Sequence, residues 1–244
     1  MKLIKTSTYE ELSQMAAAQI ISKIHANPSL KLGLATGSTP TGVYKRLIQD
    51  HGENKTTYKQ VNTFNLDEYI EISKKDPNSY HYFMCENLFD HIDIPLEQTH
   101  IPDGTAKDLE EECKRYEQFI QDHGGIDLQI LGIGQNGHIG FNEPGTSFSS
   151  RTHIINLSES TRKANSRFFK SLEDVPRQAI TMGIASIMAS KEIFLLVSGA
   201  SKAEALARLV NGEVSESFPA TVLNSHKNVT IFADKEASAL LPPP

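Results

Sequence analysis

Cysteine is scarce in this chain of 244 residues. Cys85 and Cys113 are the only two, and they lie far apart in no CxxC or other metal-binding spacing. The chain also has no apolar run of about 20 residues, the length that crosses a membrane, and no secretory apolar segment after Met1. We therefore expect a reduced, cytoplasmic protein without a metal site and without a membrane partner.

Basic residues are fewer than acidic ones, with 24 Lys and Arg residues and 30 Asp and Glu residues. A nucleic acid or an anionic membrane needs a broad basic surface, so neither is expected as the main partner. An anionic small molecule needs only a local positive pocket and is compatible with this balance. The sequence shows no linker rich in Gly, Ser or Pro, no internal repeat and no low-complexity segment. We expect a single domain over residues 1–244.

Apolar runs alternate with amphipathic segments along the chain. The runs predict strands at residues 30–35, 61–66, 127–133, 192–197 and 228–232. Helical spacing predicts helices at residues 9–24, 40–49, 79–89, 109–122, 161–169 and 201–211. Thr8 and Glu11 form a capping-box pattern before the first helix. Alternating strands and helices indicate an α/β fold, a three-layer sandwich with a mostly parallel Rossmann-like sheet.

Polar residues crowd into the glycine-rich loop that follows the 127–133 strand. Asn136, His138 and Glu143 lie there, and Pro144 ends the run. Loops at strand ends are where an open α/β sheet places its chemistry. A histidine with a nearby carboxylate can move protons near neutral pH, which makes these three residues candidate catalytic groups. A purely structural histidine is the alternative interpretation.

The same loop contains the spacing Gly132-x-Gly134-x-x-Gly137, which matches a dinucleotide-binding fingerprint. That fingerprint requires a helix directly after the glycines and belongs to a first β–α turn. Pro144 and Gly145 argue against such a helix here, and the preceding strand is the third predicted one. We therefore reject a dinucleotide site.

Two other predicted strands also end in candidate functional residues. Gly37, Ser38 and Thr39 lie between a strand and a helix whose expected first residue is Pro40. Backbone N–H groups and hydroxyls at a helix N-terminus suit a phosphate, although a simple β–α turn with a Ser/Thr cap explains the segment equally well. Asp67 follows the 61–66 strand and is a candidate general base, with a cap or turn aspartate as the alternative.

Basic residues in two predicted helices could complete a phosphate site. Lys202 falls in the first turn of its helix, where its charge opposes the helix dipole unless an anion is bound. Arg162, Lys163 and Arg167 lie on the preceding basic helix and could clamp the same phosphate. For all four side chains, a solvated surface position is the alternative.

Several of these segments together resemble the glucosamine-6-phosphate deaminase (glucosamine-6-phosphate isomerase) family. The matching segments cover nearly the whole chain in order: Leu34–Pro40, Asn65–Tyr69, Asp76–Tyr80, Leu131–Pro144, Ser149–Thr152, Ala164–Phe169 and Ser198–Ala203. The run Gly-His-Ile-Gly-Phe-Asn-Glu-Pro is the most specific of them. The resemblance implies an α/β fold, conversion of glucosamine 6-phosphate and water to fructose 6-phosphate and ammonia, and no metal or redox cofactor.

The resemblance also implies residue roles in this chain. Asp67 matches the base that removes the C2 proton. His138 matches the acid/base of ring opening, and Glu143 its carboxylate partner. The phosphate-binding positions match Ser38, Thr39, Arg167 and Lys202.

Asn136 departs from the family pattern, because many members carry an aspartate at this position. An amide can orient His138 through a hydrogen bond but supplies no charge.

A second departure concerns regulation. Members activated by N-acetylglucosamine 6-phosphate carry basic residues where this chain has His153 and Ile155. We therefore expect weak or absent activation, and a monomer or small homo-oligomer rather than a hexamer.

Two other functions remain open at this stage. A related 6-phosphogluconolactonase or sugar-phosphate isomerase would share the fold, but lactone hydrolysis does not need a base like Asp67. A non-catalytic sugar-phosphate sensor usually carries a basic helix-turn-helix segment, and the sequence shows none.

Overall fold

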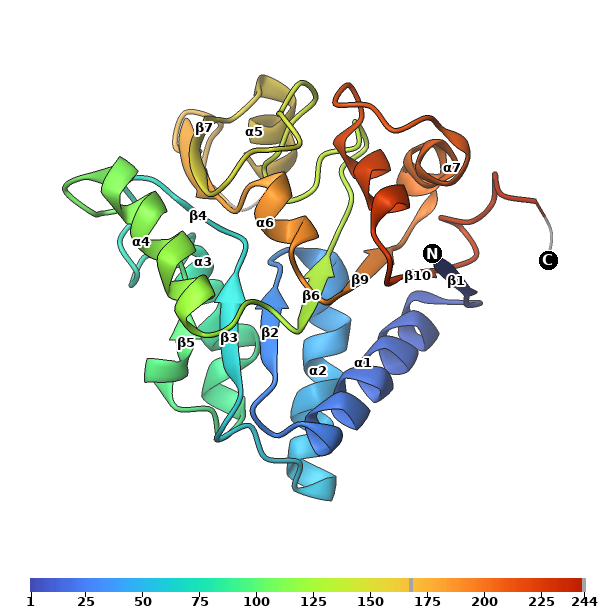
Figure 1. The fold of residues 1–244 in the computed structure, drawn as a ribbon, viewed down its shortest axis with the longest axis horizontal. Coiled ribbons are helices and arrows are strands. Elements are labelled where there is room, and N and C mark those ends of the chain that lie inside the picture. Colours follow the sequence, from blue (N-terminus) through green and yellow to red (C-terminus); the bar gives the residue numbers. More distant parts are fainter. Residues whose placement is uncertain (167–168, 243–244) are drawn as a thin grey trace.

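A sheet of seven parallel strands forms the centre of the computed structural model, which describes residues 1–166 and 169–242 (Figure 1). The strand order is β1-β10-β9-β6-β2-β3-β5, and each neighbouring pair runs parallel. The strands are β1 (Lys2–Lys5), β2 (Lys31–Leu34), β3 (Asn62–Asn65), β5 (Thr99–His100), β6 (Leu128–Leu131), β9 (Glu192–Val197) and β10 (Val229–Ala233).

Helices cover both faces of this sheet, and their apolar sides bury the alternating side chains of the strands. The α-helices are α1 (Tyr9–Ala26), α2 (Ser38–Asn54), α3 (Tyr80–Asn87), α4 (Leu109–Asp122), α5 (Glu159–Asn165), α6 (Ile184–Met188) and α7 (Ala203–Asn211). Short 3₁₀ turns are η1 (Phe89–His91), η2 (Leu96–Gln98), η4 (Ala200–Lys202) and η5 (Pro219–Ser225). One core joins α1, α2 and α3 to the sheet, and another joins α4, α6 and α7 to its opposite face. The expected three-layer α/β fold is confirmed.

Local capping fixes where several helices begin. The Thr8 hydroxyl accepts a hydrogen bond from the Glu11 N–H at 3.2 Å, and the Glu11 carboxylate accepts one from the Ser7 N–H at 2.6 Å. The cap predicted for the first helix is therefore confirmed. Asp108 caps α4 in the same way, by accepting from the Glu111 N–H. At α2 the helix begins at Ser38, so the prediction that Pro40 is its first residue was wrong.

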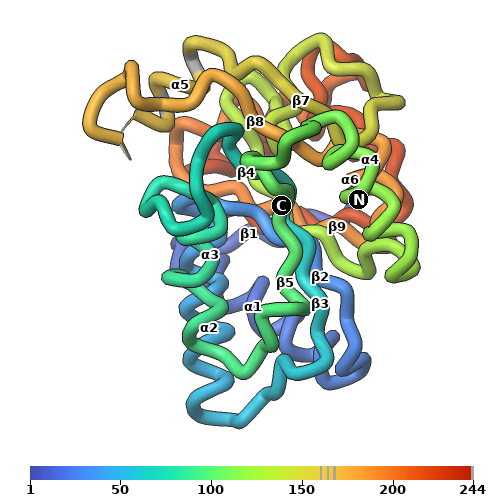
Figure 2. Tube along the Cα trace, turned by 90° about the vertical axis from the view of Figure 1, so that its left-hand side faces the viewer, coloured from blue at the N-terminus to red at the C-terminus, as the bar shows by residue number. Residues whose placement is uncertain are grey.

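A second, antiparallel sheet was not predicted. It has the order β4-β8-β7 and is formed by β4 (Asp67–Tyr69), β8 (Gln178–Thr181) and β7 (His153–Asn156). Figure 2 shows this sheet lying beyond the ends of β2 and β3. Only Leu66 separates β3 from β4: its N–H donates to Leu34, and its carbonyl accepts from Met182. The chain thus passes from one sheet to the other at Asp67, instead of ending a strand there.

Other differences from the prediction involve short or marginal elements. The first strand, β1, pairs with β10 and was missed, and α6 was also missed. The predicted helix over residues 161–169 is α5, which begins at Glu159 and ends at Asn165. Among the described residues, no helix has the length and apolar character to cross a membrane.

Tyr116 of α4 connects the neighbouring strands β3 and β5. Its hydroxyl donates to the Asn65 carbonyl at 2.7 Å and lies 3.2 Å from the His100 carbonyl, and its side chain is buried.

We predict that Tyr116→Phe lowers the free energy of unfolding by about 1–2 kcal/mol, because the buried Asn65 carbonyl loses a donor. Urea unfolding measures this. Tyr82→Phe, at an exposed tyrosine, is the control and should change stability by less than about 0.5 kcal/mol. Equal effects of the two substitutions would contradict the prediction.

Candidate active site

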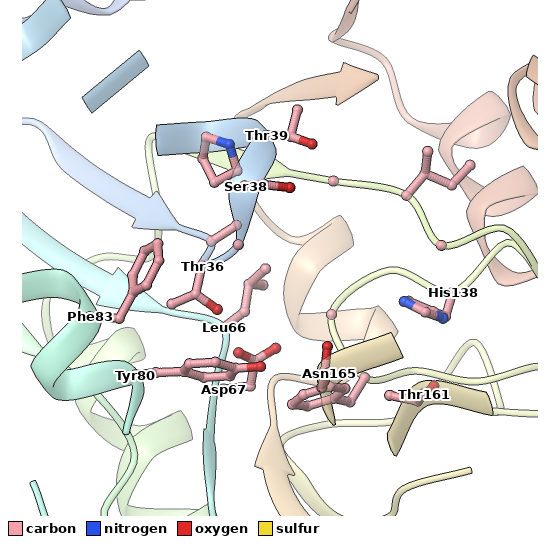
Figure 3. Close-up of a pocket in the computed structure, with 18 of the residues that line it drawn as sticks. Thr36, Ser38, Thr39, Leu66, Asp67, Tyr80, Phe83, His138, Thr161 and Asn165 are labelled. Carbon is pink, nitrogen blue, oxygen red and sulfur yellow. The ribbon is translucent and has the colours of Figure 1, made fainter. Parts of the chain in front are cut away.

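A cavity of about 660 Å³ opens at the carboxyl ends of β2, β3, β6 and β9. Its walls are the segments that follow these strands, as expected for an open parallel sheet. Figure 3 shows Asp67 and His138 reaching the cavity from different sides, with Ser38 and Thr39 along another wall. The cavity therefore brings together side chains that the sequence analysis selected from distant parts of the chain.

The turn from β2 into α2 forms one end of the cavity. Gly37 precedes the helix with φ 106°, a conformation that favours glycine, and Ser38 and Thr39 form the first helical turn. The Tyr44 hydroxyl donates to the Ala35 carbonyl at 2.5 Å and holds the beginning of this turn. Backbone N–H groups at such a helix start are suited to an anion. The predicted residues thus lie where a phosphate could bind.

Lys202 lines the same cavity from another element. It is the last residue of the short turn η4 and directly precedes α7. The predicted helix over residues 201–211 therefore begins two residues later, and Lys202 lies directly before its first turn instead of in it. Its ammonium adds positive charge to a cavity that already contains the N-terminus of α2, which further favours an anion.

Asp67 lies at the boundary between the two sheets and is only 6% exposed. Burial, followed by the negative charge of the adjacent Glu68, raises the pKa of its carboxyl to about 8. A carboxylate with a raised pKa binds protons more strongly than an exposed aspartate. The ionised Asp67 carboxylate is therefore a stronger base than that of an exposed aspartate.

Glu68 has a different role, because its carboxylate is held by the backbone. It accepts hydrogen bonds from the N–H groups of Tyr69, Tyr80 and His81 at 2.9–3.0 Å. Burial raises the pKa of Glu68 to about 7, and these three donors act in the opposite direction. Glu68 thus attaches the first turn of α3 to β4.

His138, Asn136 and Glu143 form a hydrogen-bonded chain. The Asn136 amide N–H donates to Glu143 Oε2 at 2.6 Å, and Asn136 Oδ1 lies 2.8 Å from His138 Nδ1. Because the carboxylate fixes which side of the amide carries hydrogen, Asn136 Oδ1 is an acceptor and His138 Nδ1 must carry the proton. In the neutral imidazole, Nε2 then has the lone pair and can accept a proton.

Glu143 lies behind His138 and is not among the residues that line the cavity. Its Oε2 lies 3.8 Å from His138 Nδ1, and its Oε1 accepts from the hydroxyls of Ser158, at 3.1 Å, and Thr161. Burial lowers the pKa of His138, the charge of Glu143 raises it, and Lys202 lowers it. The predicted His138–Glu143 pair therefore exists, with Asn136 as its bridge.

The predicted phosphate clamp on the basic helix is partly wrong. Arg162 donates to the carbonyls of Leu172 and Val175 at 2.8 and 3.0 Å, and Lys163 pairs with Glu159 at 2.7 Å. Neither side chain lines the cavity. Both instead hold the segment around α5. Arg167, the third predicted member, lies outside the described residues.

Aromatic and amide side chains form a wall that the sequence analysis missed. Tyr80 lines the cavity beside Asp67, and its hydroxyl donates to the Tyr69 hydroxyl at 3.1 Å (Figure 3). Asn165 of α5 donates to the same Tyr69 hydroxyl at 2.9 Å, and Phe141 stacks on Tyr80. The segment Asp76–Tyr80 is one of the segments that carry the family resemblance, but no residue in it was assigned a role. This motif was the sequence signal that could have identified Tyr80. Among the described residues, no group of His, Cys, Asp or Glu side chains is arranged to hold a metal ion.

Known protein sequences share these segments. A protein-family model described as glucosamine-6-phosphate isomerases/6-phosphogluconolactonase matches residues 5–232. The glucosamine-6-phosphate deaminase of Geobacillus sp. (strain WCH70) is 59% identical over 242 residues, which cover 99% of this chain and 96% of the relative. Glucosamine-6-phosphate deaminase 1 of Bacillus subtilis (strain 168) is 52% identical over 242 residues, covering 99% of this chain and 100% of the relative.

Solved structures agree with these sequence matches. A monomeric glucosamine-6-phosphate deaminase superposes with a TM-score of 0.97 at 52% identity, covering 98% of this chain and 100% of the other. The 6-phosphogluconolactonase from Trypanosoma brucei superposes with a TM-score of 0.77 at 22% identity, covering 99% and 98%, a likeness that shows the fold alone. Because the family model covers nearly the whole chain, the protein belongs to the glucosamine-6-phosphate isomerase/6-phosphogluconolactonase family.

Proposed function

We propose that this protein converts glucosamine 6-phosphate and water to fructose 6-phosphate and ammonia. The observation that carries the proposal is the placement of a buried carboxylate, Asp67, and the imidazole of His138 on the same cavity. Close relatives with this activity in their names support it. The reaction needs one group that moves protons between oxygens and another that removes a proton from carbon, and the two side chains fit these tasks.

Ring opening is assigned to His138. The cyclic sugar opens when a proton leaves the C1 hydroxyl and another reaches the ring oxygen. His138 Nε2 can take the first proton and deliver it to the ring oxygen, because Nδ1 already donates to Asn136. Asn136 transmits the negative charge of Glu143 only weakly, through its amide dipole. The low pKa that burial gives His138 keeps the imidazole neutral and able to accept.

Deamination is assigned to Asp67. In the open-chain aldehyde, Asp67 takes the C2 proton, and the electron pair of the C–H bond forms the C1=C2 double bond of an enolamine. The π pair of the C1 carbonyl moves to O1, which takes up a proton and becomes the C1 hydroxyl. Protonation at C1 gives an imine at C2, water adds to its carbon, and ammonia leaves to yield the ketone. Desolvation strengthens Asp67 as a base for the carbon-bound proton. All electrons stay within substrate and water, so the step is redox-neutral.

The phosphate of the substrate is assigned to the N-terminus of α2 and to Lys202. Ser38 and Thr39 supply hydroxyls and backbone N–H groups, and Gly37 lets the turn approach closely. Arg167 is proposed as a further ligand on the family resemblance alone. This end of the cavity would hold the sugar so that C1 and C2 lie between His138 and Asp67.

Oligomeric state and location belong to the same proposal. A similar solved deaminase is monomeric, which supports a monomer or small oligomer here and makes a hexamer doubtful. Cys85 and Cys113 are both free thiols, and thiols persist in a reducing compartment such as the cytoplasm.

The first prediction concerns ammonia release from glucosamine 6-phosphate. Asp67→Asn should lower kcat by about 10²–10⁴-fold, and His138→Gln by about 10²-fold, because each removes a proton-transfer group. Asp90→Asn and His91→Gln, at exposed positions, are matched controls and should keep wild-type rates. Absence of wild-type turnover would exclude the deaminase and favour a sensor. Comparable hydrolysis of 6-phosphogluconolactone would favour the lactonase.

A second prediction concerns stability. The pKa of Asp67 is about 8 in the folded protein and ordinarily 3.8. Between these values the folded state keeps a proton that the unfolded state has released, so the free energy of unfolding falls as pH rises. Asp67→Asn removes this dependence and should stabilise the protein by at least about 1 kcal/mol at pH 8, with less effect at pH 5. Urea unfolding at several pH values measures it. A pH-independent difference between Asp67→Asn and wild type would contradict the raised pKa.

A third prediction concerns Asn136. Asn136→Asp places a second carboxylate beside His138 and should raise the imidazole pKa by about one pH unit. Because ring opening needs neutral His138, the acidic limb of kcat/KM should move to higher pH. NMR titration of the histidine gives the pKa directly. An unchanged His138 titration would show that the amide bridge does not control the charge of the ring.

A further inference from the structure

The hydroxyl of Tyr9 lies against the outside of the proposed phosphate turn. Tyr9 is the first residue of α1, far from Asp67 and His138 in sequence. Its Oη lies 2.9 Å from the carbonyl oxygens of both Ser38 and Thr39, which share its single O–H donor, and it accepts from the Gly42 N–H at 2.7 Å. One side chain thus contacts three peptide groups in the first turns of α2.

We propose that Tyr9 is a positioning residue for the phosphate of the substrate, an inference that rests on the proposed function. Tyr9 does not line the main cavity, whereas Ser38 and Thr39 do. Ser38 also lines a second hollow on the outer side, together with Tyr9 and Lys45. The first turn of α2 therefore separates the two spaces, and Tyr9 supports it from behind.

Peptide geometry explains how a group outside the cavity can act inside it. In a trans peptide the C=O and the following N–H point in opposite directions. When Tyr9 holds the Ser38 carbonyl, it also fixes the direction of the Thr39 N–H, which belongs to the same peptide. Pro40 has no N–H, so this helix start offers fewer donors than usual. The orientation of the Thr39 donor consequently matters more for an anion.

Gly42 makes this contact possible. A Cβ atom at this position would lie 2.6 Å from Tyr9 Oη and 2.3 Å from Ser13 Oγ, closer than real contacts allow. The buried Ser13 leaves little room for the displaced tyrosine on that side. Gly42 therefore lets α1 approach α2 closely enough for the hydroxyl to reach the backbone.

Steady-state kinetics of Tyr9→Phe test the proposal. We expect KM for glucosamine 6-phosphate to rise about threefold to tenfold, the equivalent of one hydrogen bond, with kcat within about twofold of wild type. The inhibition constant of inorganic phosphate should rise by the same factor. A general loss of folded protein would lower apparent kcat and leave KM and the phosphate constant unchanged. Tyr82→Phe, at an exposed tyrosine of α3, is the matched control and should change none of these values.

Gly42→Ala provides a second, independent route to the same effect. The added methyl group should displace the Tyr9 hydroxyl and raise KM and the phosphate constant. In the double variant with Tyr9→Phe, the combined effect should be smaller than the product of the two single effects, because both changes remove the same contact. Multiplicative effects would show that Gly42 acts otherwise and would count against the proposal.

The outcomes separate this inference from the proposed function. If wild type releases ammonia but Tyr9→Phe keeps both KM and the phosphate constant, or loses only kcat, the positioning role is wrong. If wild type releases no ammonia, the proposed function fails. The dissociation constant of inorganic phosphate, measured by calorimetry, then tests the role of Tyr9 alone. Weaker phosphate binding by Tyr9→Phe would then still support the role of Tyr9. An unchanged constant, or no phosphate binding by wild type, would overturn it.

Discussion

The two hydrogen bonds of the Leu66 peptide groups join the two sheets, and the site depends on this junction. The N–H of Leu66 extends the parallel sheet by donating to Leu34, and its carbonyl accepts from Met182 beside the antiparallel sheet. The next residue, Asp67, is therefore enclosed between two sheets and loses most of its hydration. Its raised pKa follows from this position in the fold. A carboxylate at an ordinary strand end would be solvated and a weaker base.

Much of this arrangement could be predicted from the sequence, for identifiable reasons. The buried strands of the large sheet are apolar on both faces, so runs such as residues 192–197 are visible as strands. Parallel strands bring their carboxyl ends to one edge, which explains why Ser38, Asp67 and His138 meet although they are distant in the chain. Once the fold class is known, the motif residues can therefore be placed at the same edge of the sheet.

The missed features depend on tertiary contacts that no local pattern encodes. β7 and β8 have four residues each and β4 has three, and no side chain of β7 is fully buried, so its apolar run is short and weak as a strand signal. The direction of Arg162 is set by two carbonyls that are ten and thirteen residues away in the chain. The bridge through Asn136 required knowing which side of its amide faces Glu143. The sequence identified the helix that carries Arg162 but could not say which acceptors its side chain would reach.

The two ends of the cavity are built on opposite physical principles. At the end formed by Ser38 and Thr39, where we propose that the phosphate binds, backbone dipoles and a lysine favour an anion, and hydrogen bonds from Tyr44 and Tyr9 stiffen the turn. At the chemical end, burial disfavours the charge of Asp67 and so costs stability. The binding energy of a phosphate can hold the sugar against the buried Asp67, whose ionised form is disfavoured by burial. The position of the sugar is then well defined only if the turn at Ser38 and Thr39 is rigid. Under the proposed function, the hydrogen bonds behind the turn at Ser38 and Thr39 therefore serve substrate binding, and the proton-transfer groups serve the chemical step.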